Sequence, residues 1–170
     1  MQIQRNVNST THQFTDYFKG FEKVEAVQKI FKEKTEEVLR NLKVEFSGMR
    51  GYMGVSDLDG HIIMSAHYLQ EGDLTDIYLD IIHELAHVKQ FMEGKKLFDS
   101  NYDYVERPTE IEAYCIAVEE ARRLGFNDER ICEYLKTEWM NEEDLKKLTS
   151  LVHVNYSMPS KEKKSRKRTV

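Results

Sequence analysis

Two histidines four residues apart, His83 and His87, constrain this chain more than any other feature. Residues at this spacing lie on one face of an α-helix, one turn apart, so both imidazoles can reach a single metal ion. Glu84 follows the first histidine directly, where its carboxylate can meet a metal-bound water. Apolar residues recur around the motif at three- and four-residue steps: Ile77, Ile81, Leu85, Val88 and Met92. The pattern predicts a buried helix over residues 74–93 with a metal site on one face. The alternative is a chance pair of histidines on a wet helix face.

A third ligand is needed because a catalytic zinc ion usually takes three protein ligands and one water. One known pattern places a glycine three residues and a histidine six residues after the second histidine. Those positions hold Gln90 and Glu93 here, so the third ligand must come from elsewhere in the chain. The best source is residues 107–114, which open the next predicted helix and include Glu110 and Glu112.

Helix geometry distinguishes these two carboxylates. Residues two apart are separated by roughly 200° around a helix, so only one of the two can readily face the predicted metal. Glu110 shares its face with Ala113 and Ala117, whose small side chains allow a neighbouring helix to approach closely. This favours Glu110 as the third ligand and leaves Glu112 as the alternative. In the competing interpretation, both are solvated carboxylates favoured by the positive end of the helix dipole.

The length and charge of the chain predict one domain with a short tail. The 170 residues are enough for a hydrophobic core, and we assign residues 1–156 to the domain. The net charge is −5, but residues 159–170 hold six Lys or Arg and one Glu and so carry +5, which leaves −10 on the body. We expect residues 157–170 to be a disordered basic tail. An acidic body argues against a nucleic-acid surface on the domain, so nucleic-acid binding through the tail is conceivable but not favoured.

The remaining composition indicates a protein of the cytoplasm. No apolar run approaches membrane-spanning length, and the first residues lack the apolar core of a secretion signal. We therefore expect no membrane partner. Cys115 and Cys132 lie in helical patterns, which favours buried thiols over a disulfide framework. The sequence does not indicate an oligomeric state.

The periodicity along the chain predicts an α+β fold. Helical patterns cover residues 14–42, with Gly20 as a candidate break between a short helix and a long one, and residues 74–93, 108–124, 128–139 and 142–154. Between the first two of them, residues 43–47 alternate, glycines punctuate the chain, and residues 61–69 have the pattern of a strand. We therefore predict helices packed on a small, mostly antiparallel sheet of three strands, with the histidine-bearing helix at the centre.

Taken together, His83-Glu84-Leu85-Ala86-His87 and the downstream Glu110-Ile111-Glu112-Ala113 resemble the gluzincins, which are zinc metallopeptidases with a glutamate as third ligand. The small size is closest to the minimal gluzincins and the ImmA/IrrE-like peptidases. The resemblance covers about residues 55–124. It implies a zincin-like fold, Zn²⁺ held by His83, His87 and Glu110, and a substrate-binding edge strand at residues 61–69. The chain departs from this pattern at Tyr114, where several relatives have Asp or Asn that orients a histidine ligand.

These residues predict a zinc-dependent metallopeptidase that acts on a peptide or protein substrate. Zinc would lower the pKa of its bound water, and Glu84 would take the proton as general base. Candidates for stabilising the carbonyl oxygen are His67, Tyr102, Tyr104 and His153. One alternative is a non-catalytic or latent regulatory binding module on the same fold. Another is a nucleic-acid-associated protease, similar to the SprT-like enzymes, that uses the basic tail.

Overall fold

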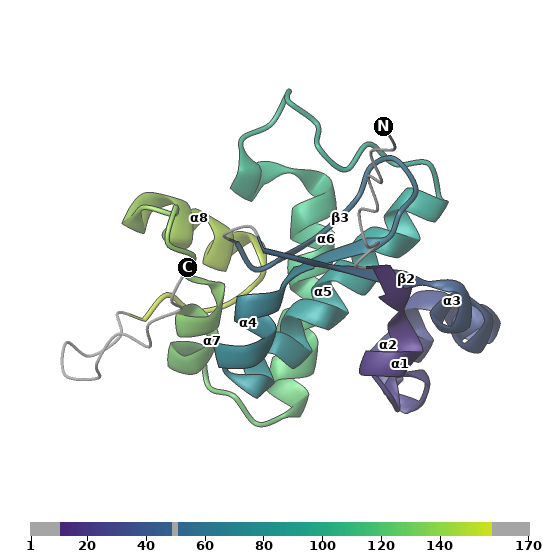
Figure 1. The fold of residues 1–170 in the computed structure, drawn as a ribbon. Helices are drawn as coiled ribbons and strands as arrows, with labels where there is room; N and C mark the ends of the chain where they lie inside the picture. Colours follow the sequence, from purple (N-terminus) through teal and green to yellow (C-terminus); the bar gives the residue numbers. More distant parts are fainter. Residues whose placement is uncertain (1–10, 49–50, 158–170) are drawn as a thin grey trace, which may run out of the picture.

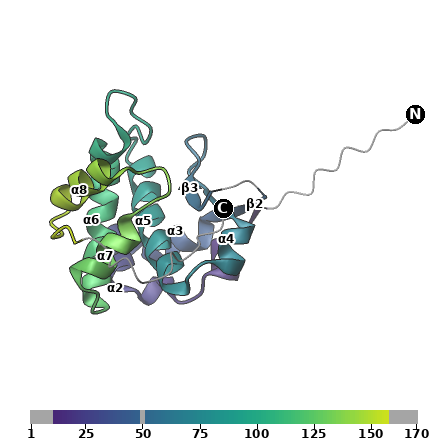
Figure 2. The ribbon, with the colours of Figure 1, turned by 90° about the vertical axis from the view of Figure 1, so that its left-hand side faces the viewer.

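The computed structural model describes residues 11–48 and 51–157. Its longest helix, α5 (Leu74–Met92), has the sheet on one side and the later helices on the other (Figure 1, Figure 2). Those later helices are α6 (Pro108–Arg123), α7 (Asp128–Leu135) and α8 (Glu142–Leu151). The predicted α+β class is confirmed. Apart from residue 157, the predicted basic tail lies outside the described residues.

The sheet has four strands rather than the predicted three, in the order β1-β2-β4-β3. The outer pairs, β1 with β2 and β3 with β4, are antiparallel, but the central pair, β2 with β4, is parallel, so the sheet is mixed. The additional strand is β1, a short polar segment whose partner lies about thirty residues away and whose sequence has no strand pattern. The strands are β1 (Thr11–Gln13), β2 (Lys43–Ser47), β3 (Met53–Val55) and β4 (Ile62–Ser65).

The predicted strand over residues 61–69 is wrong in its second half. Strand β4 ends at Ser65, whose side chain accepts a hydrogen bond from the backbone N–H of Tyr68 and so caps helix α4 (Ala66–Glu71). Strand β4 also lies inside the sheet, paired on both sides, whereas β3 lies at its edge. The edge strand that packs against α5 is therefore β3, not the segment assigned from the resemblance.

The helical pattern over residues 14–42 is divided at Gly20, as the glycine indicates, and again at Lys32, which the pattern does not indicate. Gly20 has φ +86° and Lys32 has φ +54°, and a regular α-helix cannot continue through either conformation. The resulting pieces are α1 (Phe14–Tyr17), α2 (Glu25–Phe31) and α3 (Thr35–Asn41), with short 3₁₀ turns between them. Of these pieces, α2 packs against α5.

Helices α5 and α6 lie at the border of two hydrophobic clusters. Ile81 and Leu85 of α5 belong to the cluster under the sheet, while Leu79 of the same helix belongs to the cluster formed by α6, α7 and α8. The two helices approach along an alanine face of α6 formed by Ala113, Ala117 and Ala121, all fully buried. Alanines four residues apart leave no side chain that would hold the helices away from each other.

Two smaller expectations can also be compared with the structure. Cys132 is buried and Cys115 half-buried, and both are free thiols. No helix in the described part of the chain is long and apolar enough to cross a membrane.

Candidate metal centre

The helix that carries the two histidines has well-defined ends. At its start, the Asp73 carboxylate accepts hydrogen bonds from the N–H groups of Thr75 and Asp76, at 3.0 and 3.2 Å. At its end, Gly94 takes φ +73°, which allows the chain to turn away. All eight residues from 81 to 88 are buried, as the apolar pattern predicts. Met92 is the exception to the predicted apolar stripe, because it lies in the last turn and is 54% exposed.

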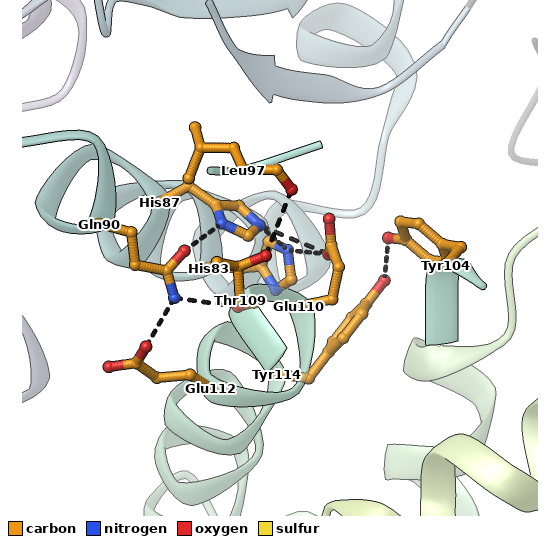
Figure 3. A network of polar contacts seen from close by, with 9 residues as sticks. All are labelled: His83, His87, Gln90, Leu97, Tyr104, Thr109, Glu110, Glu112 and Tyr114. Atoms are coloured by element: carbon orange, nitrogen blue, oxygen red, sulfur yellow. Dashed lines mark hydrogen bonds and ion pairs between the residues drawn. The ribbon is translucent and has the colours of Figure 1, made fainter. Parts of the chain in front are cut away.

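The structure brings together His83, His87 and Glu110, the three residues predicted as ligands (Figure 3). The two Nε2 atoms are 3.0 Å apart, and each lies 3.4 Å from Oε2 of Glu110. The three residues are buried, with exposures of 5–6%. Glu112, the alternative ligand, is not a member of this group. A buried group of two imidazoles and one carboxylate could hold a metal ion.

The two distances to Glu110 fit a tetrahedral ion better than they fit hydrogen bonds, while the 3.0 Å between the two imidazole nitrogens is a hydrogen-bond distance. Ligand distances of about 2.0–2.1 Å imply ligand-to-ligand distances of about 3.3–3.4 Å in a zinc tetrahedron. A charged imidazole–carboxylate hydrogen bond would instead be about 2.7–2.9 Å long. At 3.4 Å, Oε2 of Glu110 makes no hydrogen bond within the described part of the chain, although it is buried. The three donors therefore surround a position that suits a metal ion.

The electrostatics of the group are those of a cation site. Burial alone would raise the pKa of Glu110, but His83 and His87 face its carboxylate and hold the pKa far below its usual range. Burial alone would lower the pKa of His87, but Glu110, Glu84 and Gln90 raise it to about 9. A proton on His87 must leave when a metal binds the same nitrogen, so metal binding here releases protons.

Glu84 lies beside the three ligands and is not one of them. It lines the same cavity, is 7% exposed, and its Oε2 has no hydrogen-bond partner among the described residues. Burial raises the pKa of this carboxyl group. A raised pKa suits a group that must accept a proton and then release it near neutral pH.

The backs of the two imidazoles have different surroundings. Nδ1 of His87 lies 2.7 Å from Oε1 of Gln90, whereas Nδ1 of His83 has no hydrogen-bond partner in the described chain. The ring of Tyr114 instead packs against the ring of His83, with centroids 4.3 Å apart. Tyr114 stands where the resemblance would place an orienting Asp or Asn, and its hydroxyl pairs with that of Tyr104 at 2.9 Å.

A cavity of about 170 Å³ opens in front of the ligands. Of the four residues predicted to stabilise a carbonyl oxygen, only Tyr104 lines it. His67 and His153 are exposed elsewhere, and Tyr102 is 46% exposed and does not line the cavity. The wall opposite α5 is formed by strand β3, and the other lining residues are Leu97, Phe98 and Trp139.

The sequence interpretation missed the roles of Gln90, Trp139 and strand β3. Trp139 lies between α7 and α8, and its ring contacts those of Tyr52 and Tyr104, at centroid distances of 5.8 and 6.3 Å. The sequence pattern extends the predicted helix to Trp139, but α7 ends at Leu135, so the pattern gave no signal for this position. Gln90 had a signal, because it stands one helical turn after His87 and can therefore reach the back of its ring.

A larger cavity, of about 360 Å³, lies between α2 and α6. Its charged groups are already paired with each other, for example Lys29 with Glu119 at 3.4 Å and Arg123 with Glu120 at 2.7 Å. Among the described residues, only His83, His87 and Glu110 form a group that could hold a metal. The smaller cavity is therefore the candidate site, despite its size.

Comparisons with protein-family models, with curated proteins and with solved structures each found no match for this chain. Functional inference therefore rests on the site itself.

Proposed function

We propose that this chain is a zinc-dependent metallopeptidase with a zincin-like fold. The observation that carries the proposal is the spacing of the three donors, at 3.0, 3.4 and 3.4 Å, with the buried carboxylate of Glu84 beside them in one cavity. Two imidazoles and one carboxylate form the ligand set of several catalytic zinc sites, which keep the fourth position for water or substrate. A purely structural site would instead be closed by a fourth protein ligand.

In this proposal, His83 and His87 bind through Nε2 and Glu110 through Oε2. When bound, zinc would supply a Lewis acid that polarises a carbonyl group and lowers the pKa of water. Glu84 accepts the proton of the water that adds to the peptide carbonyl carbon, and then delivers it to the leaving amine nitrogen as the C–N bond breaks. The hydroxyl of Tyr104, at the wall of the cavity, is our candidate donor to the carbonyl oxygen.

The edge position of β3 supports a peptide or protein substrate. Residues Met53, Gly54 and Val55 line the cavity, and among the described residues β3 pairs with β4 on one side only. The free edge offers backbone N–H and C=O groups to an extended chain, which would pass directly in front of Glu84. An extended peptide is therefore the substrate class that the cavity suits best.

The presence of Glu84 favours a catalytic role over a non-catalytic binding role on the same fold. A metal-stabilised binding module needs the three ligands but has no use for a buried, unpaired carboxylate next to them. The alternative of a protease that acts at nucleic acid depends on the tail, which lies outside the described residues.

The proposal is tested with the parent protein and Glu84→Gln, purified without chelators. Elemental analysis should find about one zinc per chain in both, because Glu84 is not a ligand. Cleavage of a quenched fluorescent peptide library should fall by about 10²–10⁴-fold in Glu84→Gln, because an amide cannot take the proton. Glu93→Gln, at the exposed end of the same helix, is the matched control and should cleave like the parent. Absence of metal from the parent, or full activity in Glu84→Gln, would refute the proposal.

A further inference from the structure

Gln90 lies behind His87, on the side of the imidazole that faces away from Glu110 (Figure 3). It is 1% exposed, although it lies in the last turn of α5 and is polar. A buried amide must find partners for both of its ends, because an unpaired polar group costs about 1–3 kcal/mol. The partners that it finds determine which way the amide is oriented.

The amide of Gln90 has only one orientation that these partners allow. Nε2 donates to the backbone carbonyl of Thr109 at 3.0 Å and to the carboxylate of Glu112 at 2.9 Å. Both of these partners are acceptors, so the reversed amide would place its oxygen against two other oxygens. Oε1 of Gln90 must therefore face His87, where it lies 2.7 Å from Nδ1.

The orientation of the amide determines the protonation of the histidine ring. Because Oε1 can only accept, Nδ1 of His87 must carry a proton. In the neutral ring the other nitrogen, Nε2, then has its lone pair free, and it is this nitrogen that faces His83 and Glu110. The contact with Gln90 therefore selects the tautomer that a metal ligand requires.

Gln90 is itself held by its surroundings. Its backbone carbonyl accepts a hydrogen bond from the N–H of Lys95 at 2.9 Å, in the turn that Gly94 closes at the end of α5. The side chain of the same lysine bonds Glu112 at 2.8 Å, and this bond keeps the carboxylate next to the amide. The end of α5 and the start of α6 are thus connected through Gln90.

We propose that Gln90 is a positioning residue that holds His87 as its Nδ1–H tautomer and thereby sets the metal affinity of the site. This inference rests on the proposed metal centre. It assigns Glu112 a role as well, as the acceptor that fixes the amide rather than as a ligand. Hydrogen-bond partners of metal-binding histidines typically contribute about 10–100-fold in metal affinity. His83 has no equivalent partner among the described residues, which leaves Gln90 as the one side chain that fixes a ligand in this way.

The test compares the zinc dissociation constant of the parent with that of Gln90→Met, by competition with a chromophoric chelator. Methionine has a similar volume, but its thioether sulfur is only a weak acceptor for the Nδ1 proton, so the dissociation constant should rise by about 10–100-fold. Tyr78→Phe is the matched control, because it removes another hydrogen bond between α5 and α6, from Tyr78 to Glu120 at 2.6 Å. It should leave zinc affinity unchanged even where it lowers the melting temperature.

A second measurement reports the protonation of His87 directly, and its first part needs only the parent protein. In ¹⁵N NMR spectra of the zinc-loaded parent, the His87 ring should show a protonated Nδ1 whose hydrogen exchanges slowly with solvent, and in Gln90→Met this exchange should be faster. A parent that binds no zinc would refute the metal centre itself. If the parent binds zinc, affinity in Gln90→Met within threefold of the parent would overturn the inference about Gln90 alone. A parent spectrum with Nδ1 unprotonated would overturn it even if Gln90→Met does not fold.

Discussion

Replacing Glu110 by alanine should weaken zinc binding far more than replacing Glu112, although both carboxylates lie in the first turns of α6. Oε2 of Glu110 faces the Nε2 atoms of His83 and His87 at 3.4 Å. Oε2 of Glu112 instead accepts hydrogen bonds from Gln90 and from a lysine, on the far side of the imidazole. One substitution removes a ligand, and the other removes a support of a ligand.

The expected magnitudes follow from these positions. Apparent binding free energies of about 10–16 kcal/mol for four-ligand zinc sites correspond to roughly 3 kcal/mol per ligand. Glu110→Ala should therefore weaken binding by about 100-fold, since each 1.4 kcal/mol is a factor of ten. Glu112→Ala leaves the amide of Gln90 with the carbonyl of Thr109, at 3.0 Å, as its remaining acceptor. We expect a loss of less than about tenfold, at the low end of the effect of such supporting residues.

The assay is competition for zinc against a chelator of known affinity, at pH 7.5 and with matched protein concentrations. Circular dichroism of each variant checks that its helices are intact. Peptide cleavage should follow zinc occupancy in both variants. If Glu112→Ala loses more affinity than Glu110→Ala, the ligand is Glu112 and the reasoning from the alanine face of α6 is wrong. Equal and negligible losses would mean that α6 does not complete the site.

Three further predictions concern stability. Zinc at a free concentration 1,000 times its dissociation constant should stabilise the fold by about 4 kcal/mol. For a chain of this size, that is a rise of roughly 8–16 °C in melting temperature, measured by scanning fluorimetry with and without EDTA. Equal melting temperatures in the two conditions would exclude a site of this kind. In EDTA-treated protein, the pKa of His87 is raised from 6.5 to about 9, so the stability that this residue contributes is lost as pH rises through 9. The pKa of Glu110 is lowered from 4.5, so the stability that it contributes is lost as pH falls below 4.5. The contribution of this pair should therefore be largest between pH 4.5 and 6.5, and a pH series of melting curves on the parent and His87→Ala should differ most there. Gly60→Ala should lower the free energy of unfolding in urea more than Gly94→Ala does. Both glycines have positive φ, which costs alanine about 1–2 kcal/mol. Only at Gly60 would the new Cβ also lie 2.4 Å from the ring of Phe91, which adds roughly 1–3 kcal/mol.

The sequence predicts those helices whose ends carry local signals. The cap at Asp73, the proline at position 108 and the pairing of Asn141 with Asp144 all lie at or next to the helix boundaries in the structure. The helix predicted over residues 14–42 is broken at Lys32, whose positive φ has no local signal in the sequence. Strand β1 fails for a similar reason, because its identity depends on pairing with a distant strand.

In the candidate site, too, the features that depend on one helix can be predicted from the sequence, and those that depend on packing between helices cannot. The spacing of His83 and His87 and the face shared by Glu110 and the alanines are properties of single helices, so the sequence alone predicts them. In contrast, the role of Gln90 depends on the start of α6, because its partners are the carbonyl of Thr109 and the side chain of Glu112, 19 and 22 residues away. From the sequence, Gln90 could be interpreted only as a position where a ligand pattern fails. Its function becomes visible once the packing of α6 against α5 is known.

Because of that packing, two residues in the first turns of α6 act on the imidazole of His87. Glu110 faces Nε2 of His87, and Glu112 fixes the amide that accepts from Nδ1 of the same ring. Residues two apart in a helix point in nearly opposite directions, so one carboxylate can face the metal position while the other contacts Gln90. For the same reason, the two carboxylates could not both bind the metal. A rotation of α6 about its own axis would therefore disturb both nitrogens of His87 at once. The fully buried alanines, Ala113 and Ala117, oppose such a rotation, because any larger side chain turned into their place would push the helices apart. The geometry of the metal centre thus depends on the close contact between two helices as much as on the ligands themselves.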